Sequence, residues 1–220
     1  LDVTDPESRN TFMREALALR PRVDVLVYCA AILVLSPCES TAYEEYARVM
    51  QTNFLGITAF VSYVMPMMRE QKNGKIVLFS SINGLLGIPF QSAYVASKHA
   101  VEGYAECLAM ECKAMGIQVC VIEPGDHRGG SQRCRLSTQL AEASPYRDAF
   151  AKGIAIIRHD EANGLLPSGL AEAVLKNVNR KHMRFRVRVT KADQKLAVIL
   201  HDILPPSMNT RILRDYYGKK

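Results

Sequence analysis

The sequence predicts an α/β fold with a doubly wound parallel sheet and helices on both faces. Two observations indicate this class. The runs over 23–31, 75–81 and 117–125 are largely apolar, which is typical of parallel strands buried on both faces. Stretches with helical periodicity separate these runs, as expected for strand–helix–strand units. A length of 220 residues suits one large domain, so we assign residues 1–220 to a single domain.

The chain is expected to begin with a helix that ends near Leu19. In "TDPES", Asp5 can cap the helix, Pro6 suits the first helical position and Glu7 suits the positive end of the helix dipole. The elements predicted next are a strand over 23–31, a long helix over about 41–71, a strand over 75–81, a helix over about 92–115 ended by Gly116, and a strand over 117–125.

The C-terminal part of the chain has weaker patterns. We interpret residues 126–180 as a substrate-loop region, because 126–165 lack strong periodicity and predict a loop with short helices, before a helix near 167–180. The segment 181–220 is expected to hold a basic strand, from the alternating "RFRVRV", and a C-terminal amphipathic helix: 184–189 and about 191–203.

The net charge of +6 is concentrated near the C-terminus. Residues 179–220 contain 11 Lys or Arg and 3 Asp or Glu, whereas the remaining residues contain 17 and 19. We favour a solvated strand face for the basic run; anionic lipid, a phosphorylated substrate and nucleic acid are the alternatives. Few aromatic residues interleave with the basic ones, so we expect no nucleic-acid partner. Peripheral membrane contact through 181–216 stays open.

Composition excludes several classes of protein. No apolar run reaches the roughly 18 residues of a membrane span, and the polar start "LDVTDPESRN" shows no signal peptide. The six cysteines form no CxxC pair and no Cys/His cluster with metal-binding spacing. We therefore interpret them as reduced thiols, expect no metal site, and predict a cytoplasmic protein.

Tyr94 and Lys98 of "YVASK" are the first candidates for catalysis. Positions four apart share one face of a helix, and a lysine charge beside a phenol lowers the phenol pKa from about 10 toward neutrality. A tyrosine of this kind can donate or accept a proton. Ser81 ends a predicted strand, at the edge where open α/β sheets bind ligands, and its hydroxyl could donate to a developing oxyanion.

The YxxxK pair alone does not establish a site, because this spacing occurs by chance in many helices. The order of motifs is more informative: a strand ending in Ser-Ser, a loop, YxxxK on a helix and a strand ending in Pro-Gly. This order resembles the short-chain dehydrogenase/reductase family over nearly the whole chain. The segments that resemble family motifs are "LDVTD", "VLVYCAA", "VMQTNFLG", "LFSSINGLLG", "YVASK" and "IEPGDH".

The resemblance implies a Rossmann-like fold and an NAD(P)-dependent oxidoreductase that interconverts a secondary alcohol and a ketone. Tyr94 would be the acid/base, and Lys98 would lower its pKa and hold the nicotinamide ribose. Ser81 would orient the substrate oxygen. Asn53 would position a water that connects Lys98 to solvent. The cofactor would carry the hydride.

The same resemblance implies a set of cofactor contacts. Either NADP or NAD would be held by Asp2, Val3, Cys29, Ala30, Ala31, Tyr94, Lys98, Pro124, Gly125 and His127. We interpret His127 as a loop residue that contributes its backbone, because Tyr94 already fills the acid/base role. The residue that distinguishes NADP from NAD follows an earlier strand that these 220 residues do not show.

The resemblance is nearest to members that act on hydroxysteroids, retinol or 3-ketosphinganine, which implies a small lipophilic alcohol or ketone as the substrate. The segments "GLLGIPFQSAY" and "YVMPMM" suit an apolar pocket as well as an ordinary core. In this family, helices like those predicted over 41–71 and 92–115 commonly pair between subunits. We therefore expect a homodimer or a homotetramer.

The sequence departs from the family pattern in three places. The glycine-rich fingerprint that holds the pyrophosphate is absent, together with about 60 residues of two strand–helix units. We therefore expect an N-terminally incomplete chain that binds dinucleotide poorly, with the strand over 23–31 at a bare sheet edge. The family's "NNAG" is "YCAA" at 28–31, and a threonine expected after Pro124 is replaced by Gly129 or Gly130.

Two other functions stay open. A catalytically silent member or fragment of the family would act through protein association. A related epimerase or dehydratase shares the YxxxK pair, but the longer C-terminal substrate domain of those enzymes is not evident in this sequence.

Overall fold

The computed structural model describes residues 1–129 and 135–218. Gly130 and Cys134, which enter the interpretations above, lie outside the described residues. The main sheet is built from β1 (Val25–Tyr28), β3 (Gly74–Phe79), β4 (Ile117–Pro124) and β6 (Arg186–Val189). Its order is β1-β3-β4-β6, and all neighbouring strands are parallel. The α/β class with a parallel sheet is therefore confirmed.

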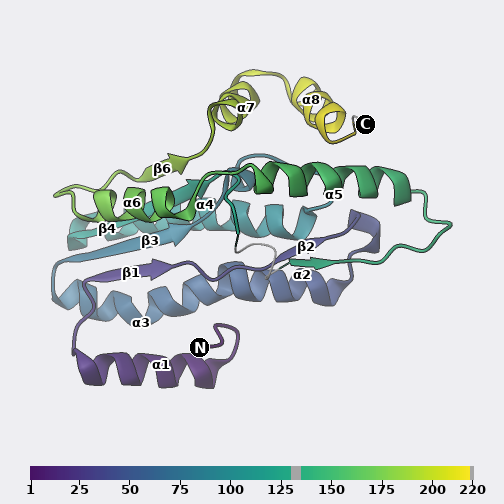
Figure 1. The fold of residues 1–220 in the computed structure, drawn as a ribbon. Helices are drawn as coiled ribbons and strands as arrows, with labels where there is room; N and C mark the ends of the chain where they lie inside the picture. The colour runs from purple at the N-terminus through teal and green to yellow at the C-terminus, as the bar shows by residue number, and fades with distance from the viewer. Residues whose placement is uncertain (130–134, 219–220) are drawn as a thin grey trace.

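Helices cover both faces of this sheet (Figure 1). Side chains alternate along a strand, so Ile76 and Leu78 of β3 point to one face and Val77 points to the other. The first face packs against α1 (Pro6–Leu19), α3 (Gly56–Glu70) and α4 (Ser92–Cys112). The second face packs against α6 (Pro167–Val178).

β1 is an edge strand of the described sheet, as the sequence predicts, although it is shorter than 23–31. Its partner is β3, with Val27 beside Val77. Tyr28 belongs to the core on the first face, whereas Val27 points to the second face and is 43% exposed. An exposed apolar side chain on an unpaired strand edge is a recognised site for pairing with another strand.

Two helix ends follow the predicted chemistry. The Asp5 carboxylate accepts hydrogen bonds from the N–H groups of Glu7, at 3.1 Å, and Ser8, at 3.0 Å. After α4 comes a short 3₁₀ turn, η4 (Lys113–Met115), and then Gly116 with φ of 75°. This left-handed conformation favours glycine, so Gly116 ends the helical stretch where the sequence places its end.

The long helical stretch predicted over 41–71 is confirmed as a continuous helical run over 43–70, but this run is not α-helical throughout. α2 (Tyr43–Met50) and α3 are separated by a π-helical segment, η2 (Gln51–Leu55). The N–H of Gly56 bonds to the carbonyl of Gln51, five residues earlier. Such π-helical segments occur frequently at functional sites, and this one contains Asn53.

The loop with short helices predicted over 126–165 is also wrong for most of its described length. α5 (Arg147–Ala162) is one continuous helix that buries Phe150, Ile154 and Ile157. Before it, β5 (Arg135–Ser137) pairs in parallel with β2 (Leu33–Leu35). These two short strands form a second sheet, which the sequence interpretation did not include.

The C-terminal segment contains two helices where one was predicted. They are α7 (Ala192–Ile203) and α8 (Pro206–Gly218). Figure 1 shows both outside the layers, beyond α5 and α6. None of the helices in the described ranges is long and apolar enough to cross a membrane.

The solvated basic face predicted for the strand over 184–189 is wrong. Arg186 and Arg188 contact both carboxylate oxygens of Glu123 on β4, at 3.2 and 2.7 Å between Nε and the oxygens. The Glu123 side chain is fully buried. Arg186 also pairs with Glu106 on α4, at 2.6 Å. The alternation therefore marks a strand whose arginines neutralise buried carboxylates, because an unpaired buried charge is unfavourable.

Candidate active site

A cavity of about 620 Å³ opens at the carboxyl ends of β3 and β4. Ser81 and Pro124 line it from the ends of these two strands. Ile157 of α5 forms another wall, and Gln194 of α7 and Tyr217 of α8 close it from the C-terminal helices. This is the edge at which open α/β sheets bind ligands.

Tyr94 and Ser81 meet at the wall of the cavity. Both residues line the cavity, and the Ser81 hydroxyl lowers the pKa of the Tyr94 phenol. The Ser81 hydroxyl donates to the carbonyl of Pro124 at 3.4 Å. Ser81 begins a short 3₁₀ turn, η3 (Ile82–Gly84), and its Oγ accepts the N–H of Asn83 at 3.1 Å. The turn fixes the serine hydroxyl, and the first turn of α4 carries the phenol toward it. The structure thus brings Ser81 and Tyr94 to one cavity, as the motif order indicates.

The lowered pKa predicted for Tyr94 is wrong in this structure. The pKa of Tyr94 is raised to about 12, chiefly by burial of the phenol; the Ser81 hydroxyl opposes the rise, and the carboxylates of Glu161 and Asp126 add to it. The Nζ of Lys98 lies 5.5 Å from the centre of the Tyr94 ring. The desolvation of the phenol outweighs this nearby cation.

Lys98 lies behind the cavity wall. It is 2% exposed, and its Nζ donates to the carbonyl of Phe79, the last residue of β3, at 2.7 Å. Burial lowers the pKa of Lys98 to about 8. A pKa of about 8 still leaves Lys98 mostly charged at neutral pH, so the raised pKa of Tyr94 follows from the burial of the phenol and not from loss of the lysine charge.

Asn53 connects three segments behind the site and is fully buried. Its Oδ1 accepts the N–H of Ile32 at 2.8 Å, and its Nδ2 donates to the Ile32 carbonyl at 2.9 Å and to Ser97 Oγ at 3.0 Å. Ser97 in turn donates to the carbonyl of Tyr94 at 2.7 Å. Asn53 therefore holds the loop after β1 against the first turn of α4, where Tyr94 and Lys98 lie.

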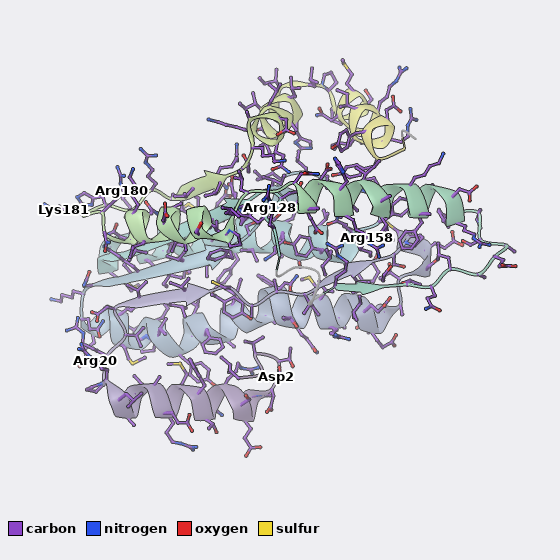
Figure 2. The ribbon with its side chains drawn as sticks, in the orientation of Figure 1. Asp2, Arg20, Arg128, Arg158, Arg180 and Lys181 are labelled. Carbon is purple, nitrogen blue, oxygen red and sulfur yellow. The ribbon has the colours of Figure 1, made fainter. Side chains whose placement is uncertain are left out.

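The predicted cofactor contacts divide between two places. The cavity is lined by Cys29, Ala31, Tyr94, Pro124, Gly125 and His127. A separate apolar groove of about 370 Å³ beside β1 is lined by Val3, Cys29 and Ala30 among others. Asp2 lines neither space. Its carboxylate accepts the N–H of Thr4 at 2.8 Å, and Figure 2 shows it near the start of α1.

The cavity residues fit the nicotinamide end of a dinucleotide. Tyr94 and Ser81 bring hydroxyl-bearing side chains to the cavity, and Ala31 lines it with a small side chain. The ring of His127 bonds through Nδ1 to the Gly125 carbonyl at 2.9 Å, and its buried Nε2 has no hydrogen-bond partner among the described residues. A polar atom of this kind suits a polar ligand group. In residues 1–129 and 135–218, no three His, Cys, Asp or Glu side chains gather as a metal site.

Three carboxylates at the cavity were missed by the sequence interpretation: Asp126, Asp160 and Glu161. The pKa of Asp126 is raised to about 6, chiefly by burial and in addition by the charges of the two other carboxylates. Glu161 pairs with Arg135, and Asp160 accepts the hydroxyl of Tyr216 at 2.8 Å. The apolar spacing of α5 could have located Glu161 on the buried face of a helix, but no sequence pattern marks Asp126.

Gln194 and Tyr217, which were also missed, close the cavity from the C-terminal helices. The amide of Gln194 bonds to the carboxylate of Asp126, and its Oε1 accepts the Asp126 N–H at 3.3 Å. A Cβ at Gly125 would overlap this amide, so the glycine permits the close approach of α7. The C-terminal helices α7 and α8 are therefore part of the cavity wall.

Comparison with known proteins gives consistent matches. The family model for short chain dehydrogenases matches residues 1–135. A 3-ketodihydrosphingosine reductase from Bacteroides thetaiotaomicron is 36% identical over 219 residues, which are 99% of this chain and 81% of the relative.

Solved structures share the fold. A short-chain dehydrogenase from Streptomyces avermitilis superposes with a TM-score of 0.79 at 26% identity, covering 98% of this chain and 77% of that one. The structure of ElxO with NADP bound has a TM-score of 0.55 at 34% identity, covering 58% of this chain and 52% of that one.

Proposed function

Because this chain belongs to the short-chain dehydrogenase family of NAD(P)-dependent oxidoreductases, we propose that it interconverts a secondary alcohol and a ketone on a lipophilic substrate. The observation that carries this proposal is that Tyr94 and Ser81 line the same cavity, with Lys98 one helical turn along α4 and its Nζ 5.5 Å from the centre of the Tyr94 ring. The two hydroxyls can bind the same substrate oxygen.

The bound nicotinamide cofactor supplies or removes the hydride at the substrate carbon. In the reducing direction, Ser81 donates a hydrogen bond to the carbonyl oxygen and orients it. Tyr94 gives its proton to this oxygen as negative charge develops, and takes the proton back in the oxidising direction. The raised pKa of Tyr94 keeps the phenol protonated at neutral pH, which suits the acid role. Lys98 stabilises the phenolate that remains.

Asn53 completes the proposed catalytic set, although it does not line the cavity. Its bonds to Ile32 and Ser97 hold the start of α4 in place. We propose that Asn53 positions the water that connects Lys98 to solvent, as the family resemblance implies. A proton that leaves Tyr94 is then replaced from the interior side of the site.

The cofactor is a nicotinamide dinucleotide, and the choice between NADP and NAD is left to experiment. NADP is bound in the structure of ElxO. We propose that the nicotinamide lies against Ala31, Gly125 and His127 and its ribose against Tyr94 and Lys98. Asp2, Val3, Cys29, Ala30 and Pro124 complete the proposed contacts.

The substrate is proposed to be a lipophilic ketone or alcohol with a positive charge near the oxygen. Ile32, Leu33 and Leu170 give the cavity an apolar lining. Asp126 and Asp160 add acidic groups; burial is the largest cause of the raised pKa of Asp126, and the nearby charges of Asp160 and Glu161 act in the same direction. A cation would relieve this repulsion. The 3-ketodihydrosphingosine of the relative's name is a long-chain amino ketone, which combines both properties.

We further propose a cytoplasmic homodimer or homotetramer. Leu55 and Met110, on the two long helical segments, are 49% and 72% exposed, as expected for side chains covered in an assembly. We propose that α7 and α8 make any peripheral contact with a membrane, because their apolar residues Leu196, Ile203 and Ile212 are exposed. Size-exclusion chromatography with light scattering, and sedimentation with vesicles, test these two proposals.

The function is tested by oxidation of NADPH and NADH with a panel of ketones, including long-chain amino ketones. We expect Tyr94→Phe to lose at least about a hundredfold in kcat, the usual contribution of an acid/base group. Tyr146→Phe is the matched control, because its hydroxyl bonds to Glu39 outside the cavity. A wild-type protein that oxidises neither cofactor with any ketone, or a fully active Tyr94→Phe, would contradict the proposal and favour the silent family member.

A further inference from the structure

Tyr28 ends β1 and fills a position behind the site that the proposed mechanism does not use. It is 5% exposed, and its hydroxyl donates to the carbonyl of Thr52 at 2.6 Å. Its ring packs against Phe60 of α3, with centroids 5.9 Å apart. The tyrosine therefore reaches from the sheet edge into the backbone of η2, the π-helical segment that contains Asn53.

Gly56 provides the space for this contact. A Cβ at position 56 would overlap the Tyr28 hydroxyl and would lie 3.2 Å from Cζ of the same ring. Gly56 has an ordinary helical conformation, with φ of −59°, so the backbone itself does not require glycine. The side chain of Tyr28 is the reason that no larger residue fits.

The contact fixes an irregular turn. The N–H of Gly56 donates to the carbonyl of Gln51 and not to the carbonyl of Thr52. The Thr52 carbonyl instead accepts a hydrogen bond from the Tyr28 hydroxyl. A π-helical turn is less favourable than an α-helical turn and persists where other contacts hold it. If the π-helical turn became an α-helical turn, the hydrogen-bond register would shift by one residue. The side chains on one side of the turn would then rotate by about 100° around the helix axis relative to those on the other side. Asn53 would then lose its alignment with Ile32 and Ser97.

We propose that Tyr28 is a positioning residue that holds the π-helical turn and thereby sets Asn53 against Ile32 and Ser97. Through Ser97, which bonds to the carbonyl of Tyr94, this arrangement fixes the first turn of α4 relative to the cavity. The effect on turnover rests on the proposed oxidoreductase function, whereas the effect on the turn does not.

The first test compares Tyr28→Phe with Tyr63→Phe. Both rings belong to the same core cluster, but the Tyr63 hydroxyl bonds to Asn10 on α1, far along the helix from Asn53. We expect Tyr28→Phe to lower kcat about tenfold, the loss that corresponds to one hydrogen bond, with KM for cofactor and ketone nearly unchanged. Tyr63→Phe should keep wild-type kcat. Equal kcat values for wild type and Tyr28→Phe would overturn the proposal.

The second test is a rescue. Gly56→Ala should lower thermal stability and disturb the turn, because its methyl group meets the Tyr28 hydroxyl. The double variant Tyr28→Phe with Gly56→Ala removes the overlapping oxygen, so it should melt at a higher temperature than Gly56→Ala alone. A double variant that is as unstable as the sum of the single changes would show that the hydroxyl does not occupy this space, and would contradict the proposal.

A third readout separates this proposal from the proposed function. In a protein labelled with ¹⁵N, the Asn53 side-chain amide should exchange with solvent slowly in the wild type and much faster in Tyr28→Phe. A wild type without turnover refutes the oxidoreductase function alone, and the exchange rates then decide the positioning role. Equal exchange rates in both proteins would refute it.

Discussion

Arg188 donates through Nε to Oε2 of Glu123 over 2.7 Å, and the side chain of Glu123 has no exposed surface. The two residues lie on neighbouring strands, β6 and β4, in the register that places Glu123 beside Arg188. This pair joins the basic C-terminal strand to the central strand that ends at the cavity. The strand is held by charge pairing as well as by apolar packing.

Arg188→Met is expected to destabilise the protein by about 2–4 kcal/mol. The change leaves Glu123 with Arg186 alone, and a buried charge that loses a partner is strongly unfavourable. The 26% exposure of Arg188 places the loss below that of a fully buried pair. Urea denaturation measures the free energy of unfolding. Arg184→Met, at an exposed position on the same segment, should change it by less than about 0.5 kcal/mol; equal losses for both variants would contradict the role of the pair.

Asp126→Asn is expected to stabilise the protein at pH 7 but not at pH 3. The folded-state pKa of Asp126 is raised to about 6 from 3.8, so the native state binds more protons than the unfolded state between these values. Stability is therefore lost as the pH rises through this window. Partial exposure reduces the effect to about 1–2 kcal/mol. Thermal unfolding of both proteins across this pH range measures the stability difference. If Asp126→Asn were stabilised equally at every pH, the ionisation of Asp126 would not be the cause.

Lys98→Met is expected to remove a pH dependence at alkaline pH. Burial lowers the pKa of Lys98 from 10.5 to about 8, so the unfolded state binds more protons in this window. The wild type should gain stability as the pH rises from 8 to 10, by an amount on the order of 2 kcal/mol. Denaturation curves at several pH values compare the two proteins. If the wild type and Lys98→Met respond alike, Lys98 does not have the lowered pKa.

Cys29 is expected to report on cofactor binding. It is exposed and lies at the junction of the cavity and the groove beside β1. Alkylation by iodoacetamide, followed by mass spectrometry, should slow about tenfold when NADP(H) is present at ten times its Kd. Cys107 of α4 is also exposed, lines neither space, and is the internal control. Labelling of Cys29 that saturating NADP(H) and NAD(H) both leave unchanged would contradict the proposed cofactor contacts.

Much of the fold could be predicted because the signals are local. Asp5 caps α1 and Gly116 ends the α4 stretch through interactions with their own neighbours. The π-helical break at Gln51–Leu55 could not be predicted, because Tyr28 contacts it from another element. The solvated face assigned to β6 was wrong for the same reason: the carboxylate that faces Arg188 lies 65 residues earlier.

The candidate site was only partly predictable. Ser81 and Tyr94 meet as the motif order indicates, and Lys98 lies one turn farther along α4. The sequence suggested that Lys98 would lower the pKa of Tyr94, but burial of the phenol raises this pKa instead. The burial of Tyr94 depends on packing against distant elements, including Phe150 and Ile154 of α5 and Tyr217 of α8, which no local motif shows.

The residues of α7 and α8 that line the cavity lie far along the chain from the residues proposed for catalysis. The groups proposed to move the proton lie between Asn53 and Lys98, whereas Gln194 and Tyr217, which close the cavity, lie in the last part of the chain. Exchange of the terminal helices between relatives would change which molecules enter while leaving the reacting groups in place. Diversity of substrates among such proteins can therefore arise by recombination at one junction, near Thr190, rather than by rebuilding the catalytic helix.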